Sequence, residues 1–317
     1  MRKIEINFNI FKGYKNIAIL LHTRPDGDTI GSGLALYHAL KNNFGVEADV
    51  LCDMPMPEKY FCLSGVEKVT DKPKNNYDLI VFCDCGDIKR VGTLPIILKG
   101  AHTITIDHHG TSENYSDENY IYAEAAANCV VMYEMFVQNN IEITKEMAEL
   151  LYAGTMTDTG GFGHSNTTAS VLKMAGHLAE LGANPHLITK AIFKQQSHEK
   201  LLFLGEAFSK IKLHNDGQIA TLVIKAEMLE KYGLDSNSNE GLIDHSMSIS
   251  GVKIAINFLQ VAKNRYKISI RSILGISAAE IASFYGGGGH TQAAGLSMQG
   301  SIEDIMDKVL YRASLYI

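Results

Sequence analysis

The sequence predicts an α/β fold with two domains: an N-terminal parallel sheet with helices on both faces and a smaller C-terminal α+β domain. Three observations support this prediction. In the first part of the chain, apolar runs typical of buried strands alternate with helical segments, and such alternation indicates a parallel sheet. A long helical stretch then extends from Ala125 to about Leu213. After it strand-like runs begin again, and 317 residues are enough for two domains of ordinary size.

The first strand is predicted over residues 17–22, where an apolar run ends in His22. Residues 29–43 follow with apolar side chains at helical spacing, and Asp28 or Thr29 is predicted to cap the start of that helix. Continuous apolar runs suit strands that are buried on both faces of a parallel sheet. Further strands are predicted at Val46–Cys52, Leu79–Asp84 and His102–Asp107.

The middle of the chain has helical patterns throughout. Helices are predicted over residues 125–140, 144–157, 167–181, 185–195 and 197–211. The last of them is expected to bridge the two domains. The predicted division is a first domain over residues 1–190, a linker-helix region over 191–213 and a second domain over 214–317.

The second domain is predicted to combine strands with two helices. The strands are expected at residues 219–224, 252–261 and 266–271, and the helices around 278–284 and 302–315. Only a short Lys-Asn-Arg turn separates the last two of these strands. Because a turn of that length joins neighbouring strands that run in opposite directions, an antiparallel arrangement is expected.

The composition excludes several classes of protein. With 46% hydrophobic and 20% charged residues, the chain is globular rather than disordered. A net charge of −6 argues against a protein that coats long nucleic acid, which needs a basic surface, but short anionic substrates are not excluded. No signal peptide or membrane span of about 20 apolar residues is expected. Five cysteines, few and odd in number, predict a reduced cytoplasmic protein rather than a disulfide framework.

Polar side chains follow three of the predicted strands at the point where each strand ends. They are His22, Asp84 and the run Asp107-His108-His109. In open α/β sheets, ligands bind beyond the carboxyl ends of the strands. These side chains are therefore expected to share one site.

Asp26, Asp28 and Asp158 are predicted to complete that site. In the motif His22-x3-Asp26-x-Asp28, an imidazole and a carboxylate four residues apart can hold one metal ion, while Asp28 reaches a second. Four carboxylates in one pocket would raise one another's pKa values, whereas two divalent ions would neutralise them. Oxygen ligands with one or two imidazoles suit Mn²⁺ or Mg²⁺. The pattern predicts a dinuclear hydrolytic centre.

Each of these motifs also has an ordinary structural interpretation. Pro-Asp-Gly-Asp is a common turn sequence with a capping Asp. Asp84 can cap a turn, and Asp158 can simply end a helix. Cys83 and Cys85 invite a thiolate-metal or redox interpretation, but residues that flank Asp84 in a strand face away from it.

A second predicted cluster lies in the C-terminal domain, where a run of glycines precedes a histidine. A flexible linker is the alternative interpretation, but glycines also let backbone N–H groups approach an anion. An arginine at the end of a strand can hold a phosphate through two parallel hydrogen bonds. The residues predicted to bind such an anion are Arg271, Gly287, Gly288, Gly289 and His290.

Together these motifs resemble those of the DHH phosphoesterase superfamily, over almost the whole chain from His22 to Gly295. The length, the Ser-Ile-Arg271-Ser segment and the glycine-His motif are similar to the bifunctional oligoribonuclease/pAp phosphatase (nanoRNase) branch, which has a DHH-associated C-terminal domain. Family II pyrophosphatases lack this glycine motif, and RecJ-type exonucleases are usually longer. Gly163 and Gln260 depart from the usual pattern of the branch and leave substrate preference open.

The resemblance implies a role for each motif residue. Two Mn²⁺ ions are implied, with Mg²⁺ or another divalent ion left open. The first would be held by His22, Asp26 and Asp84, and the second by Asp28, Asp84, His108 and Asp158, with Asp84 bridging. His109 would contact the scissile phosphate, Asp107 would orient an imidazole, and the C-terminal cluster would hold the nucleotide in a cleft between the domains.

The implied activity is hydrolysis of short oligoribonucleotides to mononucleotides and of 3′-phosphoadenosine 5′-phosphate (pAp) to AMP. The alternative is a phosphodiesterase for cyclic or linear dinucleotides such as pApA. A pyrophosphatase is disfavoured by the glycine motif, and a non-catalytic nucleotide-binding protein is disfavoured because every implied ligand is present. Short single-stranded RNA or nucleotides are the expected partners, without long duplexes or membranes, and a homodimer is left open.

Overall fold

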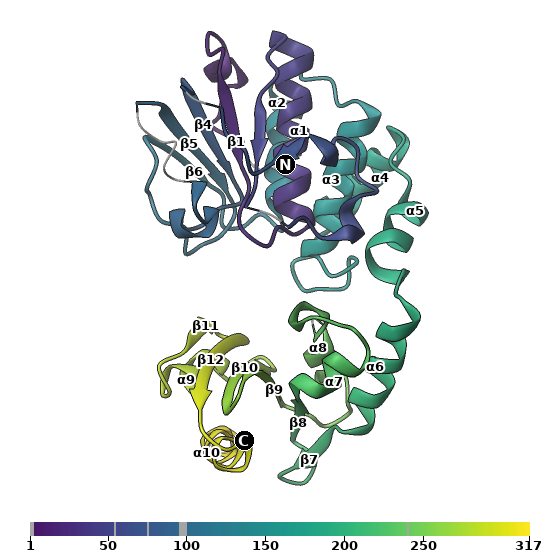
Figure 1. Ribbon diagram of the computed structural model, residues 1–317. Helices are drawn as coiled ribbons and strands as arrows, with labels where there is room; N and C mark the ends of the chain where they lie inside the picture. The colour runs from purple at the N-terminus through teal and green to yellow at the C-terminus, as the bar shows by residue number, and fades with distance from the viewer. Residues whose placement is uncertain (1–2, 54, 75, 95–99, 240) are drawn as a thin grey trace. The chain divides into compact units, whose positions relative to one another are not determined.

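The computed structural model describes residues 3–53, 55–74, 76–94, 100–239 and 241–317, without the side chains of Asn237 and His290. The chain forms two compact units, Met1–Gln195 and Gln196–Ile317 (Figure 1). No helix in the described ranges combines the length and the apolar character that a membrane span requires.

The first unit is built on a six-stranded sheet in which every neighbouring pair of strands is parallel, in the order β3-β2-β1-β4-β5-β6. The order reverses at β1, which has β2 on one side and β4 on the other. At such a switch point the connections leave in opposite directions and open a crevice at the carboxyl ends of the strands. The strands are β1 (Ile17–Leu20), β2 (Asp49–Leu51), β3 (Val69–Thr70), β4 (Leu79–Cys83), β5 (His102–Asp107) and β6 (Glu118–Ile121).

Helices pack against one face of this sheet (Figure 1). Ile17 and Ile19 of β1 point into that layer, whereas Ala18 and Leu20 point to the opposite face, because side chains alternate along a strand. The opposite face is covered in the described residues by Val91 and its neighbours around the 3₁₀ turn Ile88–Val91. The helices of this unit are α1 (Gly27–Phe44), α2 (Asn128–Gln138), α3 (Lys145–Asp158), α4 (Ala169–Glu180) and α5 (Pro185–Thr189), the last followed by a π-helical turn, Lys190–Lys194. Further 3₁₀ turns span Phe8–Phe11, Glu58–Tyr60 and Val66–Lys68.

The start of α1 differs from the prediction that Asp28 or Thr29 is its N-cap. The N-cap is Asp26, whose carboxylate accepts hydrogen bonds from the backbone N–H groups of Asp28 (3.0 Å) and Thr29 (3.2 Å). The motif is thus a strand end joined directly to a capped helix. One carboxylate satisfies the helix terminus and faces the end of β1 at the same time.

The second unit contains a six-stranded mixed sheet in the order β11-β12-β10-β9-β8-β7. Its strands are β7 (Lys212–His214), β8 (Ile219–Ile224), β9 (Ile254–Ala262), β10 (Arg265–Ser272), β11 (Gly288–His290) and β12 (Ala293–Gln299). The prediction of a purely antiparallel sheet is wrong at one pair, because β8 and β9 are parallel. The chain between them crosses back through two short helices, so that both strands start at the same end of the sheet.

Helices cover both faces of this second sheet. One layer contains α9 (Ala278–Ser283) and α10 (Ile302–Ser314), which pack on β9, β10 and β12. The other contains α6 (His198–Ser209), α7 (Ala226–Lys231) and α8 (Leu242–Met247), with a 3₁₀ turn at Ser236–Asn239. The prediction of an α/β fold with a parallel sheet followed by a smaller α+β part is confirmed. Helices are predicted on both faces of the first sheet, but in the described residues they cover one face, and the 3₁₀ turn Ile88–Val91 packs on the other.

Candidate metal centre

The carboxyl ends of β1, β4 and β5 bring the predicted acidic and histidine residues together. His22 lies two residues after β1, Asp84 directly follows β4, and Asp107 is the last residue of β5. Asp158 reaches the same place as the last residue of α3. These ends meet at the switch point of the sheet, where a parallel α/β architecture places its ligand site.

The ligand atoms of seven residues form three overlapping groups, and within each group they lie no more than 4.8 Å apart. The groups are His22, Asp26 and Asp84; Asp28, His108 and Asp158; and Asp84, His108 and His109. Asp84 and His108 each belong to two groups. The three groups therefore form one continuous centre with Asp84 in its middle.

The two carboxylate oxygens of Asp84 face two different imidazoles. Asp84 Oδ2 lies 3.5 Å from His22 Nε2, and that nitrogen lies 3.6 Å from Asp26 Oδ2. Asp84 Oδ1 lies 3.4 Å from His108 Nε2. A carboxylate in this position can bridge two ions, one on the side of each imidazole.

His108 Nε2 also faces two further carboxylates, Asp158 Oδ2 at 3.3 Å and Asp28 Oδ2 at 3.6 Å. These separations are longer than the roughly 2.7–3.2 Å of an N–H···O hydrogen bond. They match two ligands of a common ion, because ligand atoms about 2.1 Å from an ion are roughly 3.0–3.5 Å apart. The spacing therefore suits a cation better than a proton.

The hydrogen bonds of the two imidazoles support the same interpretation. The Nδ1 atom of His22 lies 2.9 Å from the carbonyl oxygen of Thr23, and that of His108 lies 3.1 Å from the carbonyl oxygen of Ala125. A carbonyl only accepts, so each Nδ1 carries a hydrogen and each Nε2 faces the carboxylates. Both Nε2 atoms and Asp84 Oδ1 are buried without a hydrogen-bond partner in the described residues. A cation between them would satisfy all three atoms.

In the absence of a cation, these carboxylates favour protonated rings. Burial alone would lower the pKa of His22, but its interactions with Asp26 and Asp84 raise that pKa to about 10. Burial opposes the same effect at His108, whose interactions with Asp158 and Asp84 raise its pKa to about 12. Because a metal ligand must be deprotonated, a bound ion would take the place of these protons.

Two of the carboxylates are destabilised in their charged form. Burial is the main cause that raises the pKa of Asp28 well above its usual range, and the charges of Asp158 and Asp84 raise it further. Burial also raises the pKa of Asp158, although its interaction with His108 opposes that shift. Divalent cations would reverse these effects, since they favour ionised carboxylates. The residues present therefore fit divalent ions.

Asp28 is held by a feature that the sequence analysis missed. Its two carboxylate oxygens accept hydrogen bonds from the backbone N–H groups of Asn128 (2.6 Å) and Cys129 (2.8 Å) at the start of α2. Asp28 is fully buried, and the helix N-terminus supplies donors that favour its negative charge. The donors are backbone groups, so no residue type in the sequence signals them.

Asp84 has a backbone conformation that is unusual for its residue type. Its φ of 61° lies in the left-handed region, and its N–H donates to the carbonyl oxygen of Ile106 at 3.0 Å. Non-glycine residues in this region cost roughly 1–3 kcal/mol and concentrate at functional sites. The turn places the Asp84 carboxylate between His22 and His108, which an extended residue in β4 would not do.

His109 and Asp107 form a separate hydrogen-bonded pair beside the centre. Asp107 Oδ1 accepts from His109 Nδ1 and from the backbone N–H of His108, both at 2.8 Å. Burial would raise the pKa of Asp107, but the hydrogen bond from His109 and that residue's charge lower it. The pair fixes the orientation of the His109 ring, and its Nδ1 lies 3.5 Å from Asp84 Oδ1.

Cys83 and Cys85 do not form part of the centre. Both side chains are fully buried. Cys83 packs in the helical layer on one face of the sheet, and Cys85 packs on the opposite face. Burial raises the pKa of both thiols well above the usual range. Thiols of this kind are inert, because the thiolate is the metal-binding and reactive form.

The predicted anion-binding cluster lies in the second unit. Arg271 pairs with Ala293 across β10 and β12, and Ala293 pairs with His290 across β12 and β11, so that the three backbones lie in one row of the sheet. Arg271 Nε lies 3.6 Å from Asp244 Oδ1. The side chain of His290 lies outside the described part of the structure.

The glycine run has a different structure from the expected anion-binding loop. Gly288 and Gly289 form part of β11, the edge strand that pairs with β12. A Cβ atom on Gly287 would lie 2.4 Å from the carbonyl oxygen of Gly295, and one on Gly289 would lie 2.4 Å from that of Ala293. The glycines therefore permit close backbone packing in a strand, and their proposed contact with substrate stays a prediction.

Comparison with known proteins agrees with this arrangement. The DHH family, N-terminal domain, matches residues 16–155, and the DHHA1 domain matches residues 216–314. The chain is 32% identical over 303 residues to the bifunctional oligoribonuclease and PAP phosphatase NrnA of Thermus thermophilus, which covers 93% of this chain and 88% of that protein. It is 28% identical over 291 residues to the protein of the same name from Bacillus subtilis, 90% of each chain.

Solved structures show the same fold. An exopolyphosphatase-related protein from Bacteroides fragilis superposes with a TM-score of 0.90 at 25% identity, over 96% of this chain and 94% of that one. RecJ from Thermus thermophilus, crystallised in complex with Mn²⁺, superposes with a TM-score of 0.54 at 15% identity, over 96% of this chain and 52% of that one. The RecJ comparison shows a common fold alone.

Proposed function

This chain belongs to the DHH phosphoesterase family, in the branch of the bifunctional oligoribonuclease and PAP phosphatase NrnA, and from that premise we propose that it hydrolyses short oligoribonucleotides to mononucleotides and pAp to AMP. The observation that carries the proposal is the continuous set of carboxylate and imidazole ligand atoms centred on Asp84. The alignments cover 88% and 90% of the lengths of these two relatives, so that nearly all of each relative has a counterpart in this chain.

We propose that two divalent ions bind this centre, with Mn²⁺ preferred over Mg²⁺. The proposed ligands of one ion are His22, Asp26 and Asp84, and those of the other are Asp28, Asp84, His108 and Asp158. When bound, such ions supply an activated water and neutralise the charge that develops on the phosphoester. Carboxylates with two imidazoles are a donor set that suits Mn²⁺.

The chain's own residues have defined tasks in this proposal. Thr23 and Ala125 fix the rings of His22 and His108 through their carbonyl oxygens, so that each Nε2 faces the carboxylates. Asp107 holds Nδ1 of His109, and the doubly protonated ring is proposed to donate from its Nε2 to the scissile phosphate. A positioned donor at the phosphate stabilises the transition state more than the ground state.

The proposed substrate specificity of the enzyme depends on residues of the second unit. Arg271 is proposed to hold a phosphate of the nucleotide, and the segment Gly287–His290 is proposed to lie beside it, because the sheet register places Arg271 and His290 in one row. With Arg271 40% exposed, its guanidinium is accessible to an anion. A cleft between the two domains that admits short chains stays a prediction.

The test is a substrate panel with Mn²⁺ and with EDTA. We expect release of AMP from pAp and of mononucleotides from RNA di- to pentanucleotides, both abolished by EDTA. Linear pApA, cyclic dinucleotides, pyrophosphate and polyphosphate complete the panel. The proposal fails if pyrophosphate or polyphosphate is the preferred substrate by kcat/KM, or if EDTA leaves pAp turnover unchanged.

Compartment and oligomeric state also stay predictions. The cysteines Cys52, Cys62, Cys83, Cys85 and Cys129 are all free thiols, which supports a reducing compartment such as the cytoplasm. Sedimentation velocity of the purified protein tests the homodimer.

A further inference from the structure

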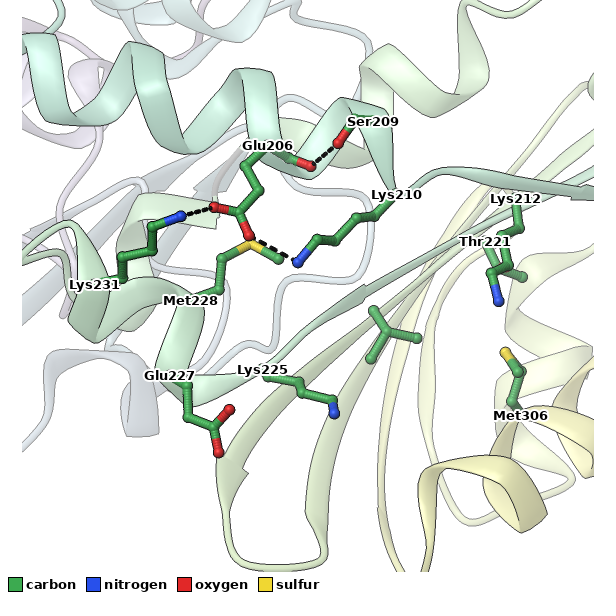
Figure 2. Close-up of a pocket in the computed structure, with 11 residues that line it drawn as sticks. Glu206, Ser209, Lys210, Lys212, Thr221, Lys225, Glu227, Met228, Lys231 and Met306 are labelled. Carbon is green, nitrogen blue, oxygen red and sulfur yellow. Dashed lines mark hydrogen bonds and ion pairs between the residues drawn. The ribbon is translucent and has the colours of Figure 1, made fainter.

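A cavity with a cationic lining lies within the second unit, and no residue of the first unit contributes to it (Figure 2). Its volume is about 590 Å³, and small-molecule sites are typically roughly 300–1,000 Å³. The charged residues of its lining are Lys210, Lys212, Lys225, Lys231, Glu206 and Glu227, with a net charge of +2. The whole chain, by contrast, has a net charge of −6.

Glu206 neutralises part of this lining from within. Its carboxylate accepts hydrogen bonds from Lys210 Nζ (2.8 Å), Lys231 Nζ (2.6 Å) and the hydroxyl group of Tyr232 (2.8 Å). These donors lower the pKa of Glu206 to about 2, so that it stays ionised at neutral pH. Glu206 is thus fully engaged, and it holds two of the four lysines in place (Figure 2).

The other two lysines, Lys212 and Lys225, have no acidic partner in the described residues. Lys212 comes from β7 and Lys225 directly follows β8, and both line the cavity (Figure 2). An ammonium group without a counter-charge in a concave site attracts anions, because low-dielectric walls focus its field. These two lysines therefore provide the anion-binding side of the cavity.

Apolar side chains also line the cavity. Val223 of β8 and Met306 of α10 belong to the layer on one face of the sheet, and Met228 of α7 belongs to the layer on the other face. Methionine is a flexible and polarisable side chain that adapts to flat ring systems. The lining therefore offers cationic groups for phosphate and apolar groups for a planar base.

The cavity is separate from the predicted Arg271 cluster within the same unit. The sheet order places β8 and β7 at one edge and β11 at the other, with β9, β10 and β12 between them. Arg271 lies on β10, which β9 separates from β8, so the two sites use different parts of one sheet.

We propose that this cavity binds a nucleoside phosphate, with the phosphate groups at Lys212 and Lys225 and the base against Val223 and Met306. The ligand is additional to the substrate of the metal centre. The proposal does not depend on the proposed phosphoesterase activity, because it rests on residues of the second unit alone.

The experiment measures binding of ADP to the full chain in EDTA by isothermal titration calorimetry. The double variant Lys212→Ala/Lys225→Ala should raise the Kd for ADP at least about tenfold, since it removes two charge-assisted contacts. The matched control is Lys173→Ala/Lys263→Ala, which removes the same charge from exposed positions outside the cavity and should change the Kd less than about twofold. Equal weakening in both pairs, or no weakening in the first, overturns the proposal.

Three further measurements locate and define the ligand. Hydrogen exchange should show protection by ADP in peptides that span residues 206–231, and protection confined to other peptides contradicts the site. Adenosine alone and pyrophosphate alone should each bind more weakly than ADP. If adenosine binds as tightly as ADP, the proposed phosphate contacts are wrong. If pyrophosphate does, the proposed base contacts are wrong. The KM for pAp should be the same in the two double variants, and a selective rise in Lys212→Ala/Lys225→Ala would make the cavity part of the substrate path instead.

Discussion

The metal centre of the first unit and the cationic cavity of the second unit gather charge in opposite ways. In the centre, His22, Asp28 and Asp84 are almost completely buried, and three of the ligand atoms have no hydrogen-bond partner in the described residues. In the cavity, Glu206 is satisfied by three donors at 2.6–2.8 Å, and the lysines paired with it are about half exposed. Burial of unpaired charge is expensive, whereas exposed charge costs little. The buried, unsatisfied ligand atoms of the first region suit a tightly held cation, whereas the exposed lysines of the second suit an anion that exchanges with solvent.

The largest effect is expected from a change at Asp84 in the buried metal centre. Asp84→Asn keeps the size of the side chain but removes the charge that both proposed ions share. Mn²⁺-dependent hydrolysis of pAp should fall by about 10³-fold or more, while far-UV circular dichroism stays unchanged. Initial rates at saturating Mn²⁺ measure this.

The matched control for that change is Asp71→Asn, at an exposed position with no hydrogen bond in the described residues. It removes the same charge and should retain the parent rate. If Asp84→Asn also retains it, Asp84 does not belong to the reacting centre.

The next effect concerns stability in the absence of metal. The folded-state pKa of His22 is about 10 and its ordinary value is 6.5, so between these values the folded protein binds a proton that the unfolded chain does not. The stability from His22 is therefore fully present below about pH 6.5 and is lost as pH rises towards 10. In EDTA, the free energy of unfolding should fall from pH 7 to pH 10, by an amount on the order of a few kcal/mol. Urea unfolding at several pH values measures this.

Two comparisons isolate the contribution of His22. His22→Gln should reduce the slope between pH 7 and 10, to which His108 also contributes, whereas His186→Gln at an exposed position should leave it as in the parent. Mn²⁺ should reverse the trend, because metal binding displaces the proton and strengthens as pH rises. An identical slope in His22→Gln and the parent would show that His22 does not hold this proton.

A smaller effect is expected at Arg271, which lies in the second unit but outside the cationic cavity. Arg271→Ala should raise the KM for pAp about tenfold and change kcat by less than about twofold, because a contact made equally in ground and transition states affects binding alone. Arg265→Ala lies on the same strand with an exposed side chain and is the matched control. An unchanged KM in Arg271→Ala would remove Arg271 from the substrate contacts.

Sequence reasoning located the parts of the molecule in which side-chain chemistry and local pattern coincide. The apolar runs of β1 and β4 are continuous because these strands are central, and β5 alternates isoleucine with threonine, so the ends of these strands and the polar residues there could be predicted. Strand β6 was missed because it is an edge strand whose residues are all half-exposed, including Glu118 and Asn119. It therefore lacks the apolar run that identifies a buried strand.

The features that remained hidden depend on the backbone or on long-range pairing. The parallel β8–β9 pair depends on a crossover through α7 and α8, helices of six residues each that are too short for a periodic pattern. The glycines before His290 could signal either an anion-binding loop or close strand packing, and only the register with β12 shows the packing. Residue types alone do not distinguish these alternatives.

The smallest effect is expected at Asp26 of the metal centre, where two roles can be tested separately. Asp26 caps α1 through two backbone N–H groups, and its other oxygen faces His22 at 3.6 Å. Asn caps helices as well as Asp does, whereas Ala does not. Both variants lose the interaction with His22, but only Asp26→Asn keeps the cap, so in EDTA Asp26→Ala should be less stable than Asp26→Asn by about 1 kcal/mol, as measured by urea unfolding. Both variants should weaken Mn²⁺ binding, because a neutral side chain replaces the carboxylate; Mn²⁺ affinity retained in Asp26→Asn would leave Asp26 as a helix cap alone.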